Sequence, residues 1–318
     1  MYSIQDILQI GKGYRVMKKV FVDGGAGTTG LRIVSRLDAR QDLERITLPD
    51  ALRKDPDARK DAICRADVAF LCLPDDAARE AVTLAADAQT VIIDTSTAHR
   101  VHPDWTYGFA EIGMREAIRQ SRRIANPGCH ASGFIALVAP LVRSGVLAPD
   151  AELSCFSLTG YSGGGKKMIA QYEDAERDAL LDAPRMYGLS QTHKHLPEMT
   201  RICGLANDPV FCPVVAPYYA GMQVTVPLTG TAKKTVEDVY RSCYTSGLVR
   251  FAQDASEEGF LSAGAFAGRD DMQITVCGND ARLTLVARFD NLGKGASGAA
   301  IQNMNIRLGL DEDTGLIV

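Results

Sequence analysis

The 318-residue sequence lacks any apolar run near the roughly 20 residues that a membrane-spanning helix needs. It also lacks a field of one charge sign: the formal net charge is −4 with acidic and basic residues interspersed, so we expect neither nucleic acid nor membrane as a partner. Its eight cysteines form no Cys-x-x-Cys pair and no closely spaced ligand set, which argues against a metal site. Reduced, scattered thiols of this kind are typical of a cytoplasmic protein.

The first sixteen residues lack the basic start and the cleavage site of a signal peptide. The first strong strand pattern begins only after Met17. Residues 1–16 are thus either a short leader or the product of a start site placed too early, and no expectation depends on them.

The first part of the chain alternates between apolar strands and helical stretches. Strand patterns cover residues 20–23, 46–48, 68–73 and 91–94, and helical ones cover residues 31–37 and 77–88. Strands without polar alternation, separated by helices, are typical of a parallel sheet covered on both faces. The pattern predicts an α/β fold with a doubly wound, parallel-sheet dinucleotide-binding domain.

Beyond about residue 130 the strand patterns become longer and more alternating, which favours an α+β domain with a mixed or antiparallel sheet. We predict a dinucleotide-binding domain over residues 17–128, completed by a C-terminal helix within 293–318, and a catalytic and dimerisation domain over 129–292. The later strands are expected at residues 154–159, 210–215, 222–228, 273–277 and 282–290, and the helices at 166–181, 235–246 and 296–308.

A glycine-rich turn over residues 24–30 follows the first strand and opens a helix. Glycines permit a tight turn and a close approach of the backbone to a pyrophosphate, while the helix start offers free N–H groups. Because strand, turn and helix come in this order, we favour dinucleotide binding over a turn that serves packing alone. The expected contacts are from Gly24, Gly27, Thr28, Thr29 and Gly30.

The residues that would distinguish NAD from NADP are ambiguous. About 20 residues after the turn, Asp50 is a candidate for the ribose hydroxyl of NAD. Arg53 and Lys54 are candidates for the 2′-phosphate of NADP. An exposed charged loop explains the same residues equally well.

Cys129 ends the sequence Asn-Pro-Gly-Cys and precedes an apolar, helix-like run. At a helix N-terminus, the dipole and the free N–H groups are expected to lower the pKa of a thiol and favour the nucleophilic thiolate. Context alone leaves catalysis and simple burial evenly balanced for this cysteine.

His193 and His195 alternate along one face of an extended segment, and Glu198 follows within reach of one of them. A base for a thiol enzyme, a metal pair and a solvated loop are the competing readings, and no third metal ligand of suitable type lies nearby.

Two further loops carry residue types that a reductase would use to contact its ligands. Ser162 and Gly163 lie in an amide-rich stretch suited to a phosphate or a carboxamide. Ser96 and Arg100 follow a parallel strand, at the end where ligands bind in open α/β sheets. Arg100 is a candidate clamp for an acyl phosphate, and solvated loops are the alternative for both stretches.

These fragments, in this order and spacing, resemble the N-acetyl-gamma-glutamyl-phosphate reductase family of arginine biosynthesis, in its shorter-chain type. The resemblance runs from about Lys18 to the end of the chain. It rests on the glycine-rich turn and on D-T-S-T-A-H-R (94–100), Y-G-F-A-E (107–111), N-P-G-C (126–129), G-Y-S-G-G-G-K (160–166), H-K-H-L-P-E (193–198), N-L-G-K-G-A (291–296) and Q-N-M-N (302–305).

The resemblance implies NADPH-dependent reduction of N-acetyl-L-glutamyl 5-phosphate to the 5-semialdehyde and phosphate, through a thioester on Cys129. It implies an acid–base role for His193, with His195 as its partner, and phosphate contacts from Asn126 and Arg100. It further implies cofactor contacts from Ser96, Ser162 and Gly163, and a homo-oligomer, dimer or tetramer.

The chain departs from longer family members in two places. His130-Ala131 stands where they continue with Tyr-Pro, and residues 217–221 lack the arginine of their Pro-x-x-Arg-Gly segment. An aspartate-semialdehyde dehydrogenase-like enzyme acting on another acyl phosphate is one alternative. A non-catalytic NADP-sensing protein is the other.

Overall fold

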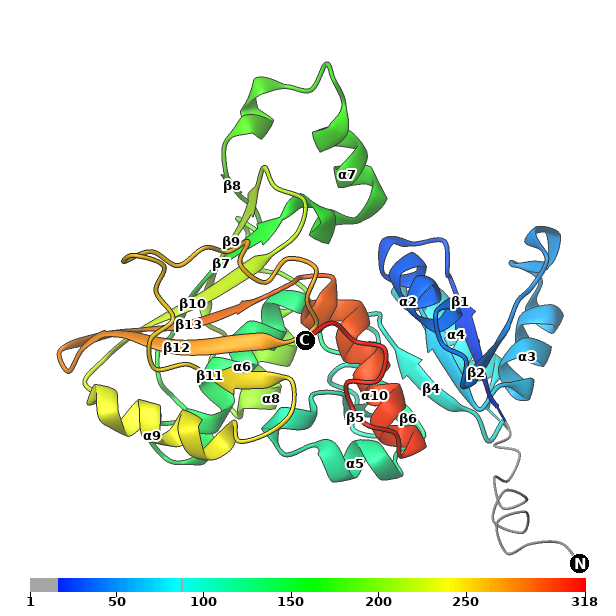
Figure 1. The fold of residues 1–318 in the computed structure, drawn as a ribbon, viewed down its shortest axis with the longest axis horizontal. Helices are drawn as coiled ribbons and strands as arrows, with labels where there is room; N and C mark the ends of the chain where they lie inside the picture. The colour runs from blue at the N-terminus through cyan, green and yellow to red at the C-terminus, as the bar shows by residue number, and fades with distance from the viewer. Residues whose placement is uncertain (1–16, 87) are drawn as a thin grey trace, which may run out of the picture.

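A computed structural model describes residues 17–86 and 88–318, so the prediction for residues 1–16 lies outside the described residues. Two β-sheets organise the chain, and helix α10 (Gly298–Leu308) lies between them (Figure 1). The six-stranded sheet has the order β2-β1-β3-β4-β6-β5, and the seven-stranded sheet has the order β11-β12-β13-β10-β7-β9-β8.

The six-stranded sheet is parallel throughout. The strand order reverses at β1, whose neighbours β2 and β3 lie on opposite sides of it. The carboxyl ends of β1 and β3 therefore flank the switch point at which ligands bind in such sheets. Its strands are β1 (Lys18–Asp23), β2 (Leu43–Ile46), β3 (Val68–Leu71), β4 (Val91–Asp94), β5 (Thr106–Tyr107) and β6 (Arg123–Ala125).

Helices cover both faces of this sheet. Val20 and Phe70 pack on one face against α2 (Thr28–Asp38) and α10, with α5 (Arg115–Gln120) beside them. Phe21 and Leu71 pack on the other face against α3 (Pro56–Arg65) and α4 (Asp75–Leu84). Neighbouring residues of one strand thus enter opposite cores, which explains the continuous apolar runs. The doubly wound prediction is confirmed.

The seven-stranded sheet is mixed, as predicted: β7–β9 and β11–β12 are parallel pairs and the other pairs are antiparallel. Helices α6 (Cys129–Arg143), α8 (Leu196–Cys203) and α9 (Lys233–Cys243) pack on one face. On the other face Phe156 is half-exposed. The strands are β7 (Ser154–Gly160), β8 (Arg185–Met186), β9 (Val210–Ala216), β10 (Met222–Thr229), β11 (Val249–Phe251), β12 (Met272–Asn279) and β13 (Arg282–Phe289).

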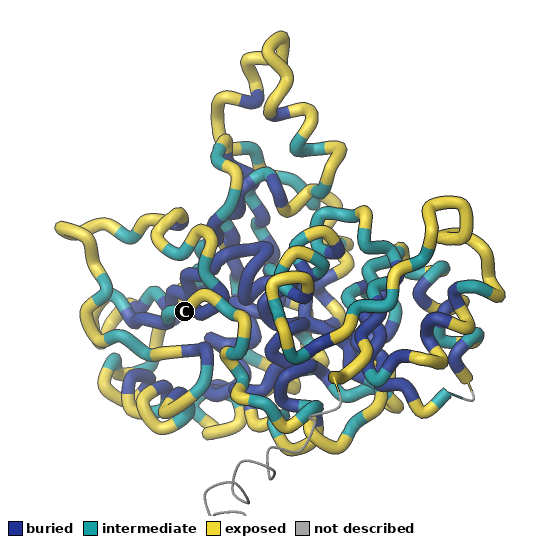
Figure 2. Tube along the Cα trace, turned by 45° about the vertical axis from the view of Figure 1, so that its right-hand side comes forward, coloured by how far each residue is buried: buried dark blue, intermediate teal, exposed yellow. Residues whose placement is uncertain are grey.

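An arm projects from the seven-stranded sheet. The arm carries α7 (Gly165–Glu173) and β8, and most of its surface is exposed (Figures 1 and 2). Its base, η3 (Tyr161–Gly164), follows β7 directly. The remaining turns are η1 (Asp50–Leu52), η2 (Ala110–Ile112), η4 (Ala179–Asp182) and η5 (Gly293–Ser297), the last of which is a π-helical turn.

Two predicted elements were misplaced. The second strand was predicted at residues 46–48 but lies at Leu43–Ile46, because an edge strand alternates in burial and its apolar signal is weak. The helix predicted over residues 166–181 ends at Glu173. There the Asp174 side chain accepts the backbone N–H of Glu176 (2.9 Å), a local turn that competes with the helix.

Among the described residues no helix is both long and apolar enough to cross a membrane. The division of the chain into domains at residues 128 and 292 stays a prediction.

Candidate active site

Cys129 is the first residue of α6, and Gly128 is the N-cap of that helix with an extended backbone. A Cβ atom at position 128 would overlap the buried side chains of Arg100, Glu198 and His195. Glycine therefore lets the chain pass close to these three side chains before the helix begins. The predicted start of a helix at the cysteine is confirmed.

Glu198, in the first turn of α8, is only 1% exposed and accepts three hydrogen bonds. One oxygen accepts from Nη1 of Arg100 (2.8 Å), and the other accepts from the Tyr107 hydroxyl (2.9 Å) and from the backbone N–H of Gly128 (3.2 Å). The first oxygen also lies 3.9 Å from Nε2 of His195. The carboxylate that the sequence paired with a histidine therefore mainly holds Arg100 and the start of α6.

Arg100 is buried and makes two further hydrogen bonds, to the backbone carbonyls of Asn126 (3.0 Å) and Thr95 (3.1 Å). Burial acts to lower the pKa of Arg100, but the neighbouring Glu198 carboxylate holds it above its usual value. The Asn126 side chain donates to the carbonyl of Ala296 (3.0 Å). Both side chains are thus fixed in place before any ligand binds.

Three histidine rings, His130, His193 and His195, form a cluster beside Cys129. The ring centres of His193 and His195 are 4.7 Å apart, and His130 lies 5.7 and 5.5 Å from them. Nδ1 of His193 accepts the backbone N–H of His195 (3.2 Å). His130 contacts the hydroxyls of Ser157 and Tyr187, each at 2.6 Å.

All three histidines are neutral at physiological pH. Burial lowers the pKa of His195 well below its usual value, that of His193 to about 4 and that of His130 to about 3. The imidazoles are therefore available as proton acceptors. Both ring nitrogens of His130 are engaged by hydroxyls, unlike those of His193 and His195.

Burial raises the pKa of the Cys129 thiol, and the nearby charges of Arg100 and Lys194 only partly offset this. The expectation that a helix start would lower this pKa was wrong, because loss of hydration outweighs the helix dipole here. The Cys129 side chain is therefore a protonated thiol at rest, and a nucleophilic role for it would require a base.

Alkylation of Cys129 by iodoacetamide tests this protonation state. Because burial disfavours the thiolate, the rate should rise with pH with a midpoint above the ordinary thiol value of about 8.5. The same cysteine in urea-unfolded protein gives the reference midpoint, read by peptide mass spectrometry. A folded-state midpoint near pH 7 or below would show that the helix dipole prevails.

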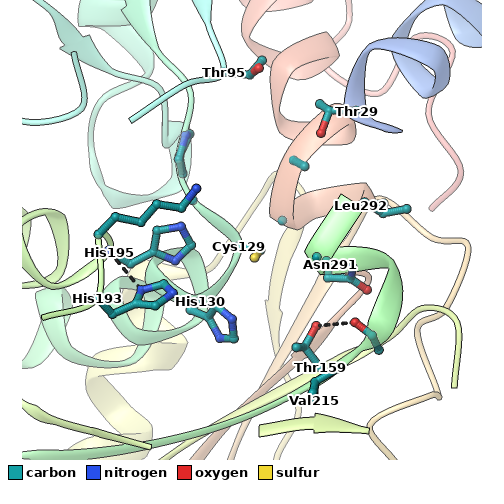
Figure 3. A pocket seen from close by; sticks show the side chains of 18 of the residues that line it. Thr29, Thr95, Cys129, His130, Thr159, His193, His195, Val215, Asn291 and Leu292 are labelled. Atoms are coloured by element: carbon teal, nitrogen blue, oxygen red, sulfur yellow. Dashed lines mark hydrogen bonds between the residues drawn. The ribbon is translucent and has the colours of Figure 1, made fainter. Parts of the chain in front are cut away.

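Cys129 and the histidines line a pocket of about 400 Å³, which adjoins a groove of about 300 Å³. Figure 3 shows the Cys129 sulfur with the histidine rings on one side and Thr29, Asn291 and Leu292 on the other. The two cavities therefore form one continuous site. Residues that line both are Thr29, Thr95, Arg100, Gly163, Lys194 and Leu292.

The groove lies at the N-terminus of α2. This helix begins after Gly27 with no side-chain cap and no acidic residue in its first turn, and the buried Thr28 hydroxyl has no partner among the described residues. Gly24 has a φ of +78°, and a Cβ there would overlap the Cys72 carbonyl. The pyrophosphate of a dinucleotide fits this place, because the helix offers free N–H donors and its positive end, and the glycines allow a close approach of the backbone.

Two polar loops complete the groove. Asp94 accepts from the backbone N–H (2.9 Å) and the hydroxyl (2.7 Å) of Ser96, and its other contact is Nδ1 of His99 (2.6 Å). The Ser162 hydroxyl accepts from the Asn291 side chain (2.9 Å). Both serines are buried and line the groove. Their hydrogen bonds to the Asp94 carboxylate and the Asn291 amide hold them in position.

The predicted site residues separate into three sets, and the roles of all of them stay predictions. Gly24 lies at the start of the glycine-rich turn and lines neither cavity. Arg53 also lines neither cavity, and its guanidinium pairs with Asp50 (2.7 Å) on the surface. The pocket brings together Cys129, His193, His195, Arg100, Asn126, Thr29 and Gly163, and the groove brings together Gly27, Thr28, Thr29, Gly30, Ser96, Arg100, Ser162 and Gly163.

Sequence reasoning gave no role to several residues that build the site. Lys194 lies between the two histidines, while Tyr107 and Asn291 lie within stretches that carried the family resemblance. Lys294, also in such a stretch, is buried and donates to both Glu111 oxygens (2.8 and 2.9 Å), which anchors the π-helical turn beside the pocket. Pairing across such sequence distances leaves no local signal.

The described residues contain no cluster suited to a metal ion.

The family comparisons match most of the chain. Residues 49–121 match a model described as the semialdehyde dehydrogenase NAD binding domain, and residues 129–291 match the semialdehyde dehydrogenase dimerisation domain. A Brucella anthropi protein named N-acetyl-gamma-glutamyl-phosphate reductase is 47% identical over 92% of this chain and 98% of its own. A Nostoc protein named N-acetyl-gamma-glutamyl-phosphate reductase 2 is 44% identical over 94% and 99%.

Solved structures support the fold. Aspartate semialdehyde dehydrogenase II from Vibrio cholerae, complexed with ASA, aligns with a TM-score of 0.70 at 15% identity, over 92% of this chain and 98% of its own. The Candida albicans aspartate semialdehyde dehydrogenase with NADP aligns with a TM-score of 0.63 at 16% identity, over 91% and 98%.

Proposed function

The chain belongs to the N-acetyl-gamma-glutamyl-phosphate reductase family of semialdehyde dehydrogenases, and from this premise we propose that it reduces N-acetyl-L-glutamyl 5-phosphate to the semialdehyde and phosphate. One observation carries the proposal. The Cys129 thiol lies at a helix start, in the same pocket as neutral imidazoles, and this pocket opens into the glycine-rich groove. In this scheme residues 17–128 and 293–318 bind the cofactor, and residues 129–292 bind and react with the substrate.

The reaction begins with proton transfer from Cys129 to a neutral imidazole. The family resemblance favours His193. However, Nδ1 of His193 already accepts a backbone hydrogen bond, and its neutral ring then carries its proton on Nε2. Neither nitrogen of His193 is therefore free to accept the thiol proton. Nδ1 of His195 has no partner among the described residues, and Glu198 lies 3.9 Å from its other nitrogen. We therefore assign the proton to His195, with Glu198 stabilising the imidazolium.

The sulfur of Cys129 then bonds to the acyl carbon, and the carbon–oxygen bond to phosphate breaks to leave a thioester. The phosphate that leaves takes a proton from water, while His195 keeps the proton of the thiol. The N–H of His193 is suited to stabilise the negative charge that develops on the acyl oxygen. As the carbon–sulfur bond breaks after reduction, the semialdehyde is released and the sulfur takes back the proton held by His195.

The groove residues are suited to hold a nicotinamide dinucleotide, which supplies the hydride when bound. The free N–H groups at the start of α2 face the pyrophosphate in this proposal, with Thr28 as a further donor. Ser96, Ser162 and Gly163 contact the cofactor nearer the pocket. The hydrogen bonds between Ser96 and Asp94 and between Ser162 and Asn291 keep this end of the groove rigid.

NADP(H) rather than NAD(H) is the cofactor in this proposal, with Arg53 and Lys54 near the 2′-phosphate. The double variant R53A/K54A should raise the KM for NADP at least about tenfold and leave that for NAD unchanged, because a charge-assisted hydrogen bond contributes about 1.5–3 kcal/mol. Steady-state kinetics with both cofactors measure this. Equal changes in the KM for NADP and the KM for NAD would show that Arg53 and Lys54 make no contact with the 2′-phosphate.

The match to a dimerisation domain supports a homo-oligomer. We propose a dimer or tetramer, in the cytoplasm, where the eight free cysteines stay reduced.

The proposed function is tested by following NADPH formation from N-acetylglutamate semialdehyde with phosphate and NADP. Turnover that requires phosphate supports it. A preference for aspartate semialdehyde would favour the aspartate enzyme-like alternative. NADP binding without turnover on either substrate would favour a sensing protein.

A further inference from the structure

Two permanent cations, Arg100 and Lys194, line both the pocket and the groove. Arg100 is buried and paired with Glu198, whose carboxylate is 1% exposed and 2.8 Å from Nη1. That buried pair carries no net charge. Three of the five N–H groups of Arg100 are also engaged by protein acceptors.

Lys194 has no ion-pair partner in the described part of the chain, and its side chain is exposed to the cavities it lines. Its charge is nonetheless felt at the reacting groups, because it acts to lower the pKa of Cys129, His193 and His195. The Asp75 carboxylate of the groove also feels this charge, because Lys194 acts to lower the pKa of Asp75. Asp75 is, however, hydrogen-bonded to the backbone N–H and the hydroxyl of Thr97, and it forms no ion pair with Lys194 in the described part of the chain.

The backbone of Lys194 is held in place by its loop. Gln191 adopts a left-handed backbone (φ 56°), and its side-chain amide exchanges two hydrogen bonds with the backbone of Phe211 on β9 (2.7 and 2.9 Å). Such a strained position persists only where the surroundings fix it. The loop thus presents Lys194 between the two histidines at a defined place.

The surroundings of the Lys194 side chain suit an anion. Among the described residues that line the pocket, none is an aspartate or a glutamate, and the one such residue that lines the groove, Asp75, is hydrogen-bonded to Thr97. The start of α6 lacks an acidic residue and a side-chain cap, and the buried Nδ1 of His195 lacks a partner in the described chain. A group with several oxygens and negative charge would meet the ammonium of Lys194 and the N–H groups at the start of α6. Nδ1 of His195 becomes a further donor once it has taken the Cys129 proton.

We propose that Lys194 binds the phosphoryl group of the acyl phosphate and, in the reverse direction, inorganic phosphate. This rests on the proposed function and extends it, because Lys194 then supplies the charge that the Arg100–Glu198 pair cannot. The negative charge of the leaving phosphate is stabilised beside the sulfur that displaces it.

Kinetics of the K194M variant in the phosphate-dependent oxidation test the proposal. The KM for inorganic phosphate should rise at least about tenfold, as for loss of one charge-assisted contact, while the KM for NADP stays within about twofold. K194R should restore most of the phosphate affinity. K167M removes the same charge from one of the two exposed lysines of α7, outside both cavities, and should leave both constants unchanged.

A second readout does not depend on turnover. Inorganic phosphate should slow alkylation of Cys129 by iodoacetamide in the wild-type protein and in K167M, and should not do so in K194M. This protection remains measurable if the proposed substrate is wrong, so the two failures are distinguishable. A rise in the KM for NADP alone, or phosphate protection that persists in K194M, would overturn the proposal.

Discussion

Replacing Cys129 by serine is expected to lower the phosphate-dependent rate by about 10⁴-fold or more, while NADP binding is retained. Serine keeps the size of the side chain, but its hydroxyl is a far weaker acid and leaving group than a thiol. An ester on serine would also release the aldehyde less readily after reduction, because an alkoxide is a poorer leaving group than a thiolate. Steady-state rates and cofactor titration measure the two properties separately.

Cys64 provides the matched control, because it is an exposed free cysteine that lines neither cavity. C64S should have wild-type kinetics. Residual activity of C129S near the wild-type level would show that the sulfur at position 129 forms no thioester, and the proposed chemistry would fail.

Replacing Glu198 by alanine is expected to cost about 3–5 kcal/mol of folding free energy, because it leaves the buried Arg100 guanidinium without its counter-charge. The Tyr107 hydroxyl and the Gly128 N–H lose their acceptor in the same change. Since small domains have only about 5–15 kcal/mol in total, the melting transition should shift strongly. Urea and thermal unfolding measure it.

The matched control is E116A, which removes an exposed carboxylate of α5 from a surface pair with Arg119. Its expected cost is at most about 0.5 kcal/mol. The isosteric variant E198Q adds a second readout. Because the Glu198 charge acts to raise the pKa of the Cys129 thiol, E198Q should move the alkylation midpoint to lower pH. Unchanged stability in E198A would mean that the buried charge of Arg100 is compensated elsewhere.

The parts of the fold that sequence predicted well are those whose signal is local. β4 lies at the predicted residues 91–94 because both faces of a central parallel strand are buried and its run is continuously apolar. The start of α6 at Cys129 follows from a Pro-Gly break before a helical run. Edge strand β2 and the end of α7 were missed, because one is half-exposed and the other is stopped by a side-chain hydrogen bond.

The candidate site was predictable in its chemistry but not in its charge balance. The sequence identified Cys129, His193 and His195, which the structure places around one pocket. It could not reveal that Glu198 neutralises Arg100 across 98 residues of chain, or that burial outweighs the helix dipole at the thiol. Both depend on which distant groups share a low-dielectric interior, and spacing along the chain does not encode that.

Thioester formation on Cys129 is tested most directly by acylating the protein with N-acetylglutamyl phosphate in the absence of NADPH. We expect release of about one equivalent of phosphate per active site and an N-acetylglutamyl thioester mapped by mass spectrometry to Cys129, which NADPH then discharges as the semialdehyde. Turnover that proceeds with no acyl adduct on Cys129, or with the adduct on another cysteine, would contradict it.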